Sequence, residues 1–261
     1  MGMICLHDKP EIEQFLRRSV RLHIYSIGDL DDFFWPHTTW YGYKTDRGLE
    51  AIALVYAGPD LPTVLALSDS PDVMAELLGS ILNLLPDRFY AHLSPGLERT
   101  LEESFELESL GAHSKMALAG IPAAAKIDCA GVELLSMDDL PAIEALYSDS
   151  YPGNWFDPRM LETDHYFGIA DMGRLVSIAG IHVYSRRYRV AALGNITTLP
   201  THQGRGLATR VTAKLCQSLL EEGIEVGLNV KADNHAAVSC YRKIGFETVA
   251  AYEEFAIRRR R

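Results

Sequence analysis

Two glycines between a β-rich run and a helical pattern constrain the fold of this chain more than any other feature. They lie within residues 198–208, Thr-Leu-Pro-Thr-His-Gln-Gly-Arg-Gly-Leu-Ala. β-Branched and apolar residues dominate 189–199, which predicts a strand, and apolar residues recur every four positions over 207–219, which predicts a helix. The glycine loop therefore follows a strand and opens a helix.

A strand-to-helix turn of this kind can hold a phosphate group. The first backbone N–H groups of a helix lack partners inside it, and the positive end of the helix dipole attracts an anion. Gly204 and Gly206 carry no side chain that would block the approach. The chain has no Gly-x-x-x-x-Gly-Lys-Ser/Thr sequence, and Thr209 stands where a dinucleotide loop needs a small residue, so both of these phosphate loops are excluded.

The loop fits a different phosphate-binding motif. Gln203, Gly206 and Ala208 match Gln/Arg-x-x-Gly-x-Gly/Ala, which resembles the pyrophosphate-binding motif of the GNAT acyltransferase superfamily. The Thr-Leu-Pro sequence before the loop most resembles the branch that includes glycine N-acyltransferase-like enzymes. The resemblance implies that the chain binds acetyl-CoA (coenzyme A) as an acyl donor.

A second block of residues extends this resemblance. After an apolar run at 226–230, residues 233–246 resemble the Asn-x-x-Ala-x-x-x-Tyr-x-x-x-Gly-Phe signature of the same superfamily, with Asn234 and Tyr241 at its polar positions. The two motifs occur in the family order and are separated by one helix and one strand. The resemblance covers residues 132–261.

Charge divides the chain into two unequal halves. Residues 1–125 hold 9 Lys and Arg against 18 Asp and Glu, whereas residues 126–261 hold 16 against 17. Residues 119–125 between them are small and uncharged, which is typical of a connector. We therefore expect two domains, 1–125 and 126–261. The net charge of −10 argues against nucleic acid and anionic membrane as partners, because phosphate polyanions would be repelled.

Cysteine spacing and hydropathy exclude several further classes. The four cysteines lie far apart and form no Cys-x-x-Cys pair, so neither a zinc site nor a disulfide framework is indicated. No apolar run approaches the ~20 residues that span a bilayer, and no export signal is visible. We expect a cytoplasmic protein that needs no metal.

Residues 126–261 predict the element order β, α, β, β, β, α, β, α, β. A helix is expected at 140–147, and strands are expected at 132–135, 166–170, 175–183, 189–199 and 226–230. This is the order of the GNAT fold. The resemblance therefore implies an α/β domain with a mixed central sheet for this half of the chain.

Residues 1–125 repeat that scheme in a reduced form. Strands are expected at 51–56, 63–67 and 89–93, and helices at 72–85 and 96–105. Where the second half has its glycine loop, the first half has Ser68-Asp69-Ser70-Pro71-Asp72, whose acidic side chains would repel a pyrophosphate. We therefore expect two GNAT-like acyl-CoA N-acyltransferase domains, of which the N-terminal one is degenerate and does not bind coenzyme A.

The resemblance assigns the acetyl-CoA contacts to the loop and to the two helices that follow. It implies a bulge over residues 197–199, whose free N–H groups bond the pantetheine arm and the thioester carbonyl. Asn234 is expected both to cap its helix and to contact coenzyme A. The residues expected to bind coenzyme A are Thr198, Leu199, Gln203, Gly204, Arg205, Gly206, Leu207, Ala208, Thr209, Asn234 and Tyr241.

Two positions are expected to act directly in the chemistry. Backbone N–H groups at Thr198 would stabilise the oxyanion that forms when an amine attacks, and Tyr241 matches the family position that protonates the departing thiolate. Ala192 and Asn195 stand where some relatives carry a glutamate, and neither can act as a base. Either a water relay or another residue must then accept the proton, and the candidates are Glu133, His165, His182 and His202.

The acceptor side of the site is less defined by the sequence. Trp155-Phe156-Asp157 and Tyr166 lie where the family forms its acceptor wall, and packing at a helix start explains them equally well. The arginines at 186, 187 and 189 either belong to an exposed hairpin or hold a carboxylate. Residues 258–261 are expected to form a solvated tail.

The sequence thus predicts an N-acetyltransferase. It would move an acetyl group from acetyl-CoA to a primary amine of a small molecule or an amino acid by direct attack. A non-catalytic acyl-CoA-binding sensor or interaction module is the alternative, because the strand carboxylate is missing. A monomer and a homodimer both fit the sequence.

Overall fold

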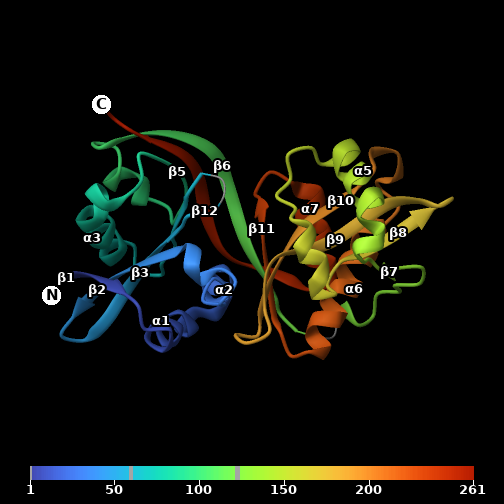
Figure 1. The fold of residues 1–261 in the computed structure, drawn as a ribbon, viewed down its shortest axis with the longest axis horizontal. Coiled ribbons are helices and arrows are strands. Elements are labelled where there is room, and N and C mark those ends of the chain that lie inside the picture. The colour runs from blue at the N-terminus through green and yellow to red at the C-terminus, as the bar shows by residue number, and fades with distance from the viewer. Residues whose placement is uncertain (1, 59–60, 121–123) are drawn as a thin grey trace. The chain divides into compact units, whose positions relative to one another are not determined.

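The protein is a mixed α/β protein that divides into two compact units. The structure, a computed structural model, describes residues 2–58, 61–120 and 124–261. Figure 1 shows its helices and strands. Unit 1 comprises Met1–Lys115, Lys231–Asp233 and Val249–Arg261, and unit 2 comprises Met116–Val230 and Asn234–Thr248.

These units differ from the division at residue 125 that the sequence predicts. Unit 1 is built from both ends of the chain, because the last strand packs with it rather than with the segment that precedes it. The predicted connector at 119–125 includes residues 121–123, which lie outside the described residues. Within the described ranges, no helix is long and apolar enough to cross a membrane.

Unit 1 contains a sheet in the order β1-β2-β3-β4-β5-β12-β6. The pair β4–β5 is parallel, whereas β1–β2, β2–β3, β3–β4 and β5–β12 are antiparallel. The elements are β1 (Gly2–Leu6), α1 (Lys9–Leu16), α2 (Val20–Gly28), β2 (Thr38–Thr45), β3 (Gly48–Tyr56), β4 (Thr63–Ala66), α3 (Pro71–Ile81), β5 (Arg88–Leu93), β6 (Phe105–Leu118) and β12 (Phe246–Arg259).

Helix α3 supplies much of the core of unit 1. Pro71 stands at its first turn, where the missing N–H costs nothing, and the apolar face of the helix packs on β1, β2 and β3. Leu77 and Leu78 are fully buried in the same cluster as Phe89 and Phe105, whose rings meet edge to face. Burial of these side chains fixes the helix on the sheet.

Unit 2 contains the strands β11-β10-β9-β8-β7 in that order. Only β10–β11 is parallel among the pairs of these five strands. The elements are β7 (Glu133–Leu134), α5 (Leu140–Ser150), β8 (Phe167–Asp171), β9 (Arg174–Ser185), β10 (Val190–Thr198), α6 (Leu207–Glu221), β11 (Glu225–Lys231) and α7 (His235–Ile244). Each element predicted over 132–246 is confirmed in type.

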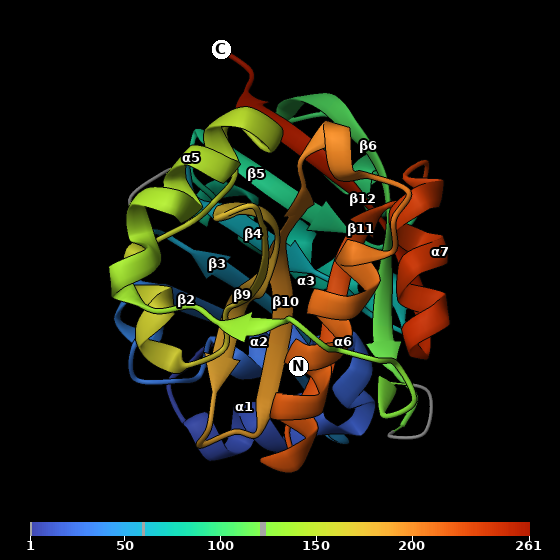
Figure 2. The same cartoon turned by 90° about the vertical axis from the view of Figure 1, so that its right-hand side faces the viewer.

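Helices cover both faces of the sheet of unit 2. Helix α5 contacts β9 and β10, and α6 contacts the same two strands and α7 (Figure 2). Nearly every residue of β9 from Leu175 to Ser185 is buried as a result. A strand covered on both faces carries apolar side chains on both, which explains its continuous apolar sequence.

The two units have similar element orders, and one difference concerns a predicted helix. Unit 1 has a 3₁₀ turn, η4 (Leu97–Thr100), where unit 2 has α7. The helix predicted at 96–105 is therefore wrong. Gly96 adopts a left-handed φ of 92°, which starts a turn instead of a helix. Leu97, Leu101 and Phe105 are all buried, so their spacing reflects a packed turn rather than a helical face.

Candidate functional site

Strand β10 separates from β11 near its C-terminal end. The parallel pairing runs from Val190↔Glu225 to Leu193↔Leu228, although β10 continues to Thr198. Against β9 the register shifts between Gly194 and Thr197, which marks a bulge. The edge of β10 that faces β11 therefore offers backbone groups beyond Leu193 that the sheet does not use.

The bulge lies slightly earlier than the sequence predicts. Thr198 is back in register opposite Ser177, and the Leu199 N–H donates to the Val176 carbonyl at 2.9 Å. Successive N–H groups of a strand point to opposite edges, so the Thr198 N–H points away from β9. Of the two predicted donors, Leu199 is used by the sheet and Thr198 faces the opening between β10 and β11.

Side-chain contacts hold the loop against the end of β10. The Thr198 hydroxyl is buried and lies 2.8 Å from the Ser177 hydroxyl. The Gln203 side-chain amide donates to the Thr198 carbonyl at 3.3 Å. Gln203, the first residue of the predicted phosphate motif, thus ties the loop to the strand that carries the bulge.

The two loop glycines adopt conformations that other residues avoid. Gly204 has φ of 76°, and Gly206, the N-cap of α6, has φ of 77°. A Cβ atom at either position would meet no heavy atom within 4 Å. Glycine is thus required here by the backbone, and the space above the loop is open.

The first turn of α6 adds further backbone N–H groups next to the glycine loop. The N–H groups of Leu207, Ala208 and Thr209 lie in the first turn and therefore have no intrahelical acceptor. No side chain caps the helix in their place. The buried Leu207 side chain anchors the turn, and the Thr209 hydroxyl lies 3.2 Å from the Cys240 sulfur of α7. Open N–H groups at a helix N-terminus suit an anion such as a pyrophosphate.

Two arginines next to the loop already have partners. The Arg205 guanidinium lies 3.4 Å from the Asp171 carboxylate, on the surface of unit 2. The Arg210 guanidinium donates to the Ala130 carbonyl. Both side chains are thus engaged by other residues, and the Arg205 side chain is 56% exposed.

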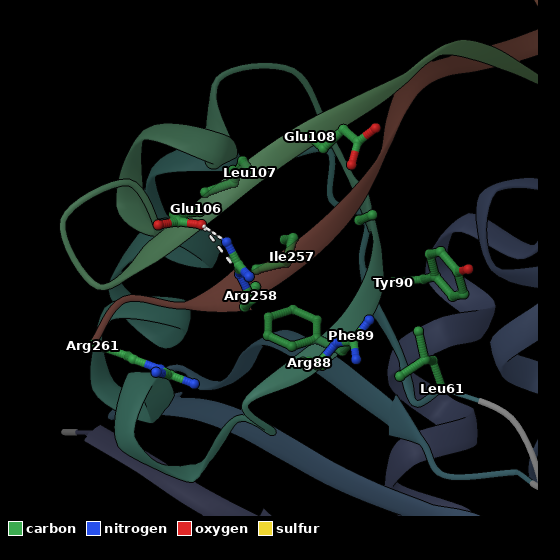
Figure 3. A pocket seen from close by; sticks show the side chains of 11 residues that line it. Leu61, Arg88, Phe89, Tyr90, Glu106, Leu107, Glu108, Ile257, Arg258 and Arg261 are labelled. Atoms are coloured by element: carbon green, nitrogen blue, oxygen red, sulfur yellow. Dashed lines mark hydrogen bonds and ion pairs between the residues drawn. The ribbon is translucent and has the colours of Figure 1, made fainter.

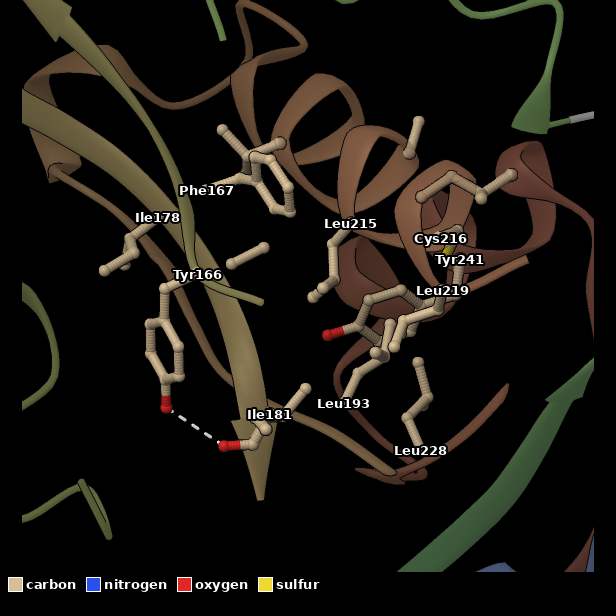
Figure 4. Close-up of a cluster of buried hydrophobic side chains, with 14 of the residues drawn as sticks. Tyr166, Phe167, Ile178, Ile181, Leu193, Leu215, Cys216, Leu219, Leu228 and Tyr241 are labelled. Carbon is tan, nitrogen blue, oxygen red and sulfur yellow. Dashed lines mark hydrogen bonds between the residues drawn. The ribbon is translucent and has the colours of Figure 1, made fainter. Parts of the chain in front are cut away.

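The second motif forms α7, which lies against α6. The Asn234 side chain accepts from the Ala237 N–H at 3.1 Å, so Asn234 is an N-cap as predicted. Tyr241 belongs to the buried cluster that also holds Leu193, Leu215 and Leu219 (Figure 4). Burial raises the pKa of Tyr241, and its hydroxyl forms no hydrogen bond with the described residues.

A buried polar network surrounds Asn195 in the bulge. Asn195 has φ of 54°, a left-handed conformation that asparagine tolerates. Its amide nitrogen donates to the Trp155 carbonyl and to the Tyr166 hydroxyl, each at 3.0 Å. Its own carbonyl accepts from the Tyr147 hydroxyl at 2.9 Å. From the sequence, Asn195 is noted only as a residue that cannot act as a general base. Nothing in the residues around it indicates this network.

The four candidate bases lie in different surroundings. Glu133 is exposed on β7. The buried His165 lies 3.4 Å from Glu222 near the C-terminal end of α6, and His202 lies 3.2 Å from Asp171. Only His182 contacts the bulge, because its ring packs on Gly194 and its Nε2 lies 3.2 Å from the Asn195 amide oxygen.

The aromatic residues that the sequence offers either as an acceptor wall or as packing lie in different surroundings. Trp155 is 42% exposed, and its ring meets that of His182 edge to face. Tyr166 is fully buried and donates to the Ile181 carbonyl, so it belongs to the core and cannot face a substrate. Phe156 packs on it, and Asp157 caps the turn Pro158–Thr163 and pairs with Arg159.

Two groups of arginines lie away from this site. Arg186, Arg187 and Arg189 are exposed at the β9–β10 hairpin. Arg258, Arg260 and Arg261 are exposed, as expected of a solvated segment, but the segment is held in place, because Arg258 pairs with Glu106, Arg259 pairs with Asp87 and Arg260 donates to carbonyls near the start of β6. Arg88, Arg258 and Arg261 line a hollow of about 740 Å³ in unit 1, which contains none of the predicted site residues (Figure 3).

Comparison with known proteins identifies the class of fold. A tandem GNAT protein from the clavulanic acid biosynthesis pathway superposes with a TM-score of 0.58 at 13% identity, covering 98% of each chain. At that identity the likeness concerns the fold alone. This chain thus has the fold of a tandem GNAT protein.

The sequence comparison finds a family match in the second half of the chain. Residues 133–246 match the model of the Acetyltransferase (GNAT) family. N-alpha-acetyltransferase RimI of Mycobacterium tuberculosis is 37% identical over 90 residues, which span 33% of this chain and 54% of RimI. Mycothiol acetyltransferase of Kocuria rhizophila is 35% identical over 100 residues, which span 36% of this chain and 32% of that protein.

Proposed function

We propose that unit 2 is an N-acetyltransferase that moves an acetyl group from acetyl-CoA to a primary amine. The proposal rests on two features that lie together at the end of β10. The strand separates from β11 there, and the glycine loop at the N-terminus of α6 follows directly. The opening gives the pantetheine arm a strand edge to bond, and the loop gives the pyrophosphate a set of N–H donors.

Several of the predicted residues have a role in this arrangement. The N–H groups of residues 204–209 bind the pyrophosphate, and Gln203 holds their loop against β10. The Thr198 N–H polarises the thioester carbonyl, a contribution of the kind that is worth about 10²–10³ in rate. The Tyr241 hydroxyl, which has no hydrogen-bond partner among the described residues, donates to the sulfur as the thiolate departs.

Unit 1 is proposed to be a degenerate domain that does not bind coenzyme A. Its strand β4 pairs with β5 along its whole length, from Thr63↔Tyr90 to Ala66↔Leu93. Beyond that point, the Ser68 N–H donates to the buried Ser94 hydroxyl at 3.0 Å. The strands that open in unit 2 therefore stay joined in unit 1, and acidic Asp72 stands in the first turn of α3.

The acceptor is proposed to be an amino group of a small molecule or an amino acid. Trp155 and His182 form a partly open aromatic corner beside the bulge, where an amine can approach the thioester. Two relatives support an acetyltransferase role, since RimI is named as an N-alpha-acetyltransferase and the Kocuria rhizophila protein as a mycothiol acetyltransferase. A cytoplasmic monomer or homodimer of the glycine N-acyltransferase-like branch fits this proposal.

Calorimetric titration with acetyl-CoA tests the binding site. Gly206→Glu places a negative side chain in the open space above the loop and should abolish micromolar binding. Gly223→Glu is the matched control, because Gly223 has a similar φ of 71°, equally open surroundings and a place at the other end of α6. Binding that survives in Gly206→Glu, or that is lost equally in Gly223→Glu, would contradict the assignment of the pyrophosphate site to this loop.

Tyr241→Phe separates an enzyme from an acyl-CoA sensor. The substitution keeps the ring that packs edge to face on Phe246 and removes only the hydroxyl. Thiol release from acetyl-CoA with a panel of amines (glycine, glucosamine, spermidine and an alanine-terminated tetrapeptide) should fall about 10²-fold or more, with unchanged acetyl-CoA affinity. A wild type that binds acetyl-CoA but releases no thiol with any of these amines would favour the sensor.

A further inference from the structure

The His182 ring occupies a fixed place against the bulge of β10. An added Cβ on Gly194 would lie 2.2 Å from the ring, so the imidazole packs directly on the backbone of the bulge. The Trp155 ring meets it edge to face at 5.9 Å on another side. His182 thus lies between the part of β10 that is left open and the exposed aromatic side chain.

Hydrogen bonds around Asn195 determine which nitrogen of His182 carries the proton. The Asn195 amide nitrogen donates to the Trp155 carbonyl, which leaves its oxygen as an acceptor toward His182. His182 Nε2, 3.2 Å from that oxygen, must therefore hold a hydrogen and donate it. In the neutral ring the lone pair then lies on Nδ1, which forms no hydrogen bond with the described residues.

The surroundings keep this ring neutral. Burial lowers the pKa of His182, and the bond to Asn195 opposes that shift only in part. Burial also raises the pKa of Tyr147 and of Tyr166, so both phenols of the network stay uncharged. Asp157 is neutralised by Arg159 at 2.5 Å. No unpaired carboxylate among these neighbours is available to hold His182 in its protonated form.

We propose that His182 is the general base of this site and that Asn195 is the residue that positions it. The inference rests on the acetyltransferase function proposed above. The nitrogen of the attacking amine forms a bond to the thioester carbon, and His182 Nδ1 accepts a proton from that nitrogen. The carbon–sulfur bond breaks, and Tyr241 supplies the proton that the thiolate takes up. Both side chains then exchange protons with water, so the products are an amide and free coenzyme A.

His182→Gln tests this role, with His165→Gln as the matched control. Glutamine keeps a donor for Asn195 but removes the basic nitrogen, whereas His165 is a buried histidine of the same unit that does not touch the bulge. Thiol release with the best amine of the panel should fall about 10²–10⁴-fold in His182→Gln, and acetyl-CoA affinity should stay within twofold. The His165 variant should keep the wild-type kcat.

The pH profile and the ring tautomer give further readouts. After correction for titration of the amine itself, the acidic limb of kcat/KM in the wild type should contain a further group with a pKa below 6.5, and that group should be absent from His182→Gln. Nitrogen NMR of the free protein should show hydrogen on Nε2 and none on Nδ1. Gly194→Ala, which displaces the ring, should lower kcat without changing acetyl-CoA binding.

The outcomes distinguish the two proposals. If the wild type transfers to no amine, the acetyltransferase function and the base assignment both fail. If the wild type is active and His182→Gln retains its kcat, only the base assignment fails. Hydrogen on Nδ1 in the NMR spectrum would overturn the assignment even with an active wild type, because no lone pair would then face the amine.

Discussion

At the scale of single residues, Asn195 shows how much one side chain organises in unit 2. It adopts a left-handed φ of 54° in the bulge and joins the Trp155 carbonyl, the Tyr166 hydroxyl and the His182 ring through its amide. Its partners come from different elements of the unit. The sequence could not reveal the network, because each contact depends on the tertiary fold, and asparagine is common in turns that have no such role.

Replacing Asn195 should therefore destabilise the protein more than most substitutions. Asn195→Gly removes the amide but tolerates the backbone, and should lower the free energy of unfolding by about 2–3 kcal/mol, since several buried polar groups lose partners. Asn195→Ala should cost about 1 kcal/mol more, because alanine resists a left-handed φ. Urea denaturation measures both, and equal stability of the two variants would contradict the strain argument.

At the scale of elements, the strand and helix pattern of unit 2 could be predicted almost completely. Its elements are either continuous apolar runs or repeats of about four residues, as in α6, and glycines mark their ends. In unit 1, none of the elements from β1 to β2 was predicted from the sequence. Helix α1 buries only Ile12 and Leu16, and two buried positions are too few to show a helical repeat in the sequence. The predicted helix at 96–105 failed because the buried apolar residues Leu97, Leu101 and Phe105, which lie in a turn and at the start of β6, have the spacing of a helical repeat.

The paired ends of β4 and β5 give a test of how unit 1 stays closed. Ser94 is buried, and its hydroxyl accepts from the Ser68 N–H at 3.0 Å. Ser94→Ala should lower the free energy of unfolding by about 1–2 kcal/mol because that N–H loses its acceptor. Acetyl-CoA affinity should not change. A variant that binds acetyl-CoA more weakly in calorimetry would show that unit 1 takes part in binding.

At the scale of the whole molecule, stability should depend on pH through buried histidines. Burial, together with nearby Lys115, lowers the pKa of His23 from 6.5 to about 4. Between these values the unfolded chain binds more protons at this position than the folded one, so the free energy of unfolding falls as the pH is lowered from 6.5 to 4. His23 should contribute about 2–3 kcal/mol to this fall.

Urea denaturation of His23→Gln at pH 7 and pH 4.5 measures that contribution. The stability of the variant relative to the wild type should be higher at pH 4.5 than at pH 7, because glutamine takes up no proton. His7→Gln, at an exposed histidine near the same end of the chain, is the control and should show no such change. A pH dependence that is the same in the wild type and in His23→Gln would contradict the shifted pKa.

We propose that the chain holds one acetyl-CoA site and that this site lies in unit 2. Amide hydrogen exchange with and without acetyl-CoA tests it most directly, because it locates binding on the backbone. Exchange should slow at residues 197–210 and at the start of α7, and stay unchanged at 66–73, which follow β4 in unit 1. Protection at 66–73, or no protection at 197–210 under saturating acetyl-CoA, would contradict the account.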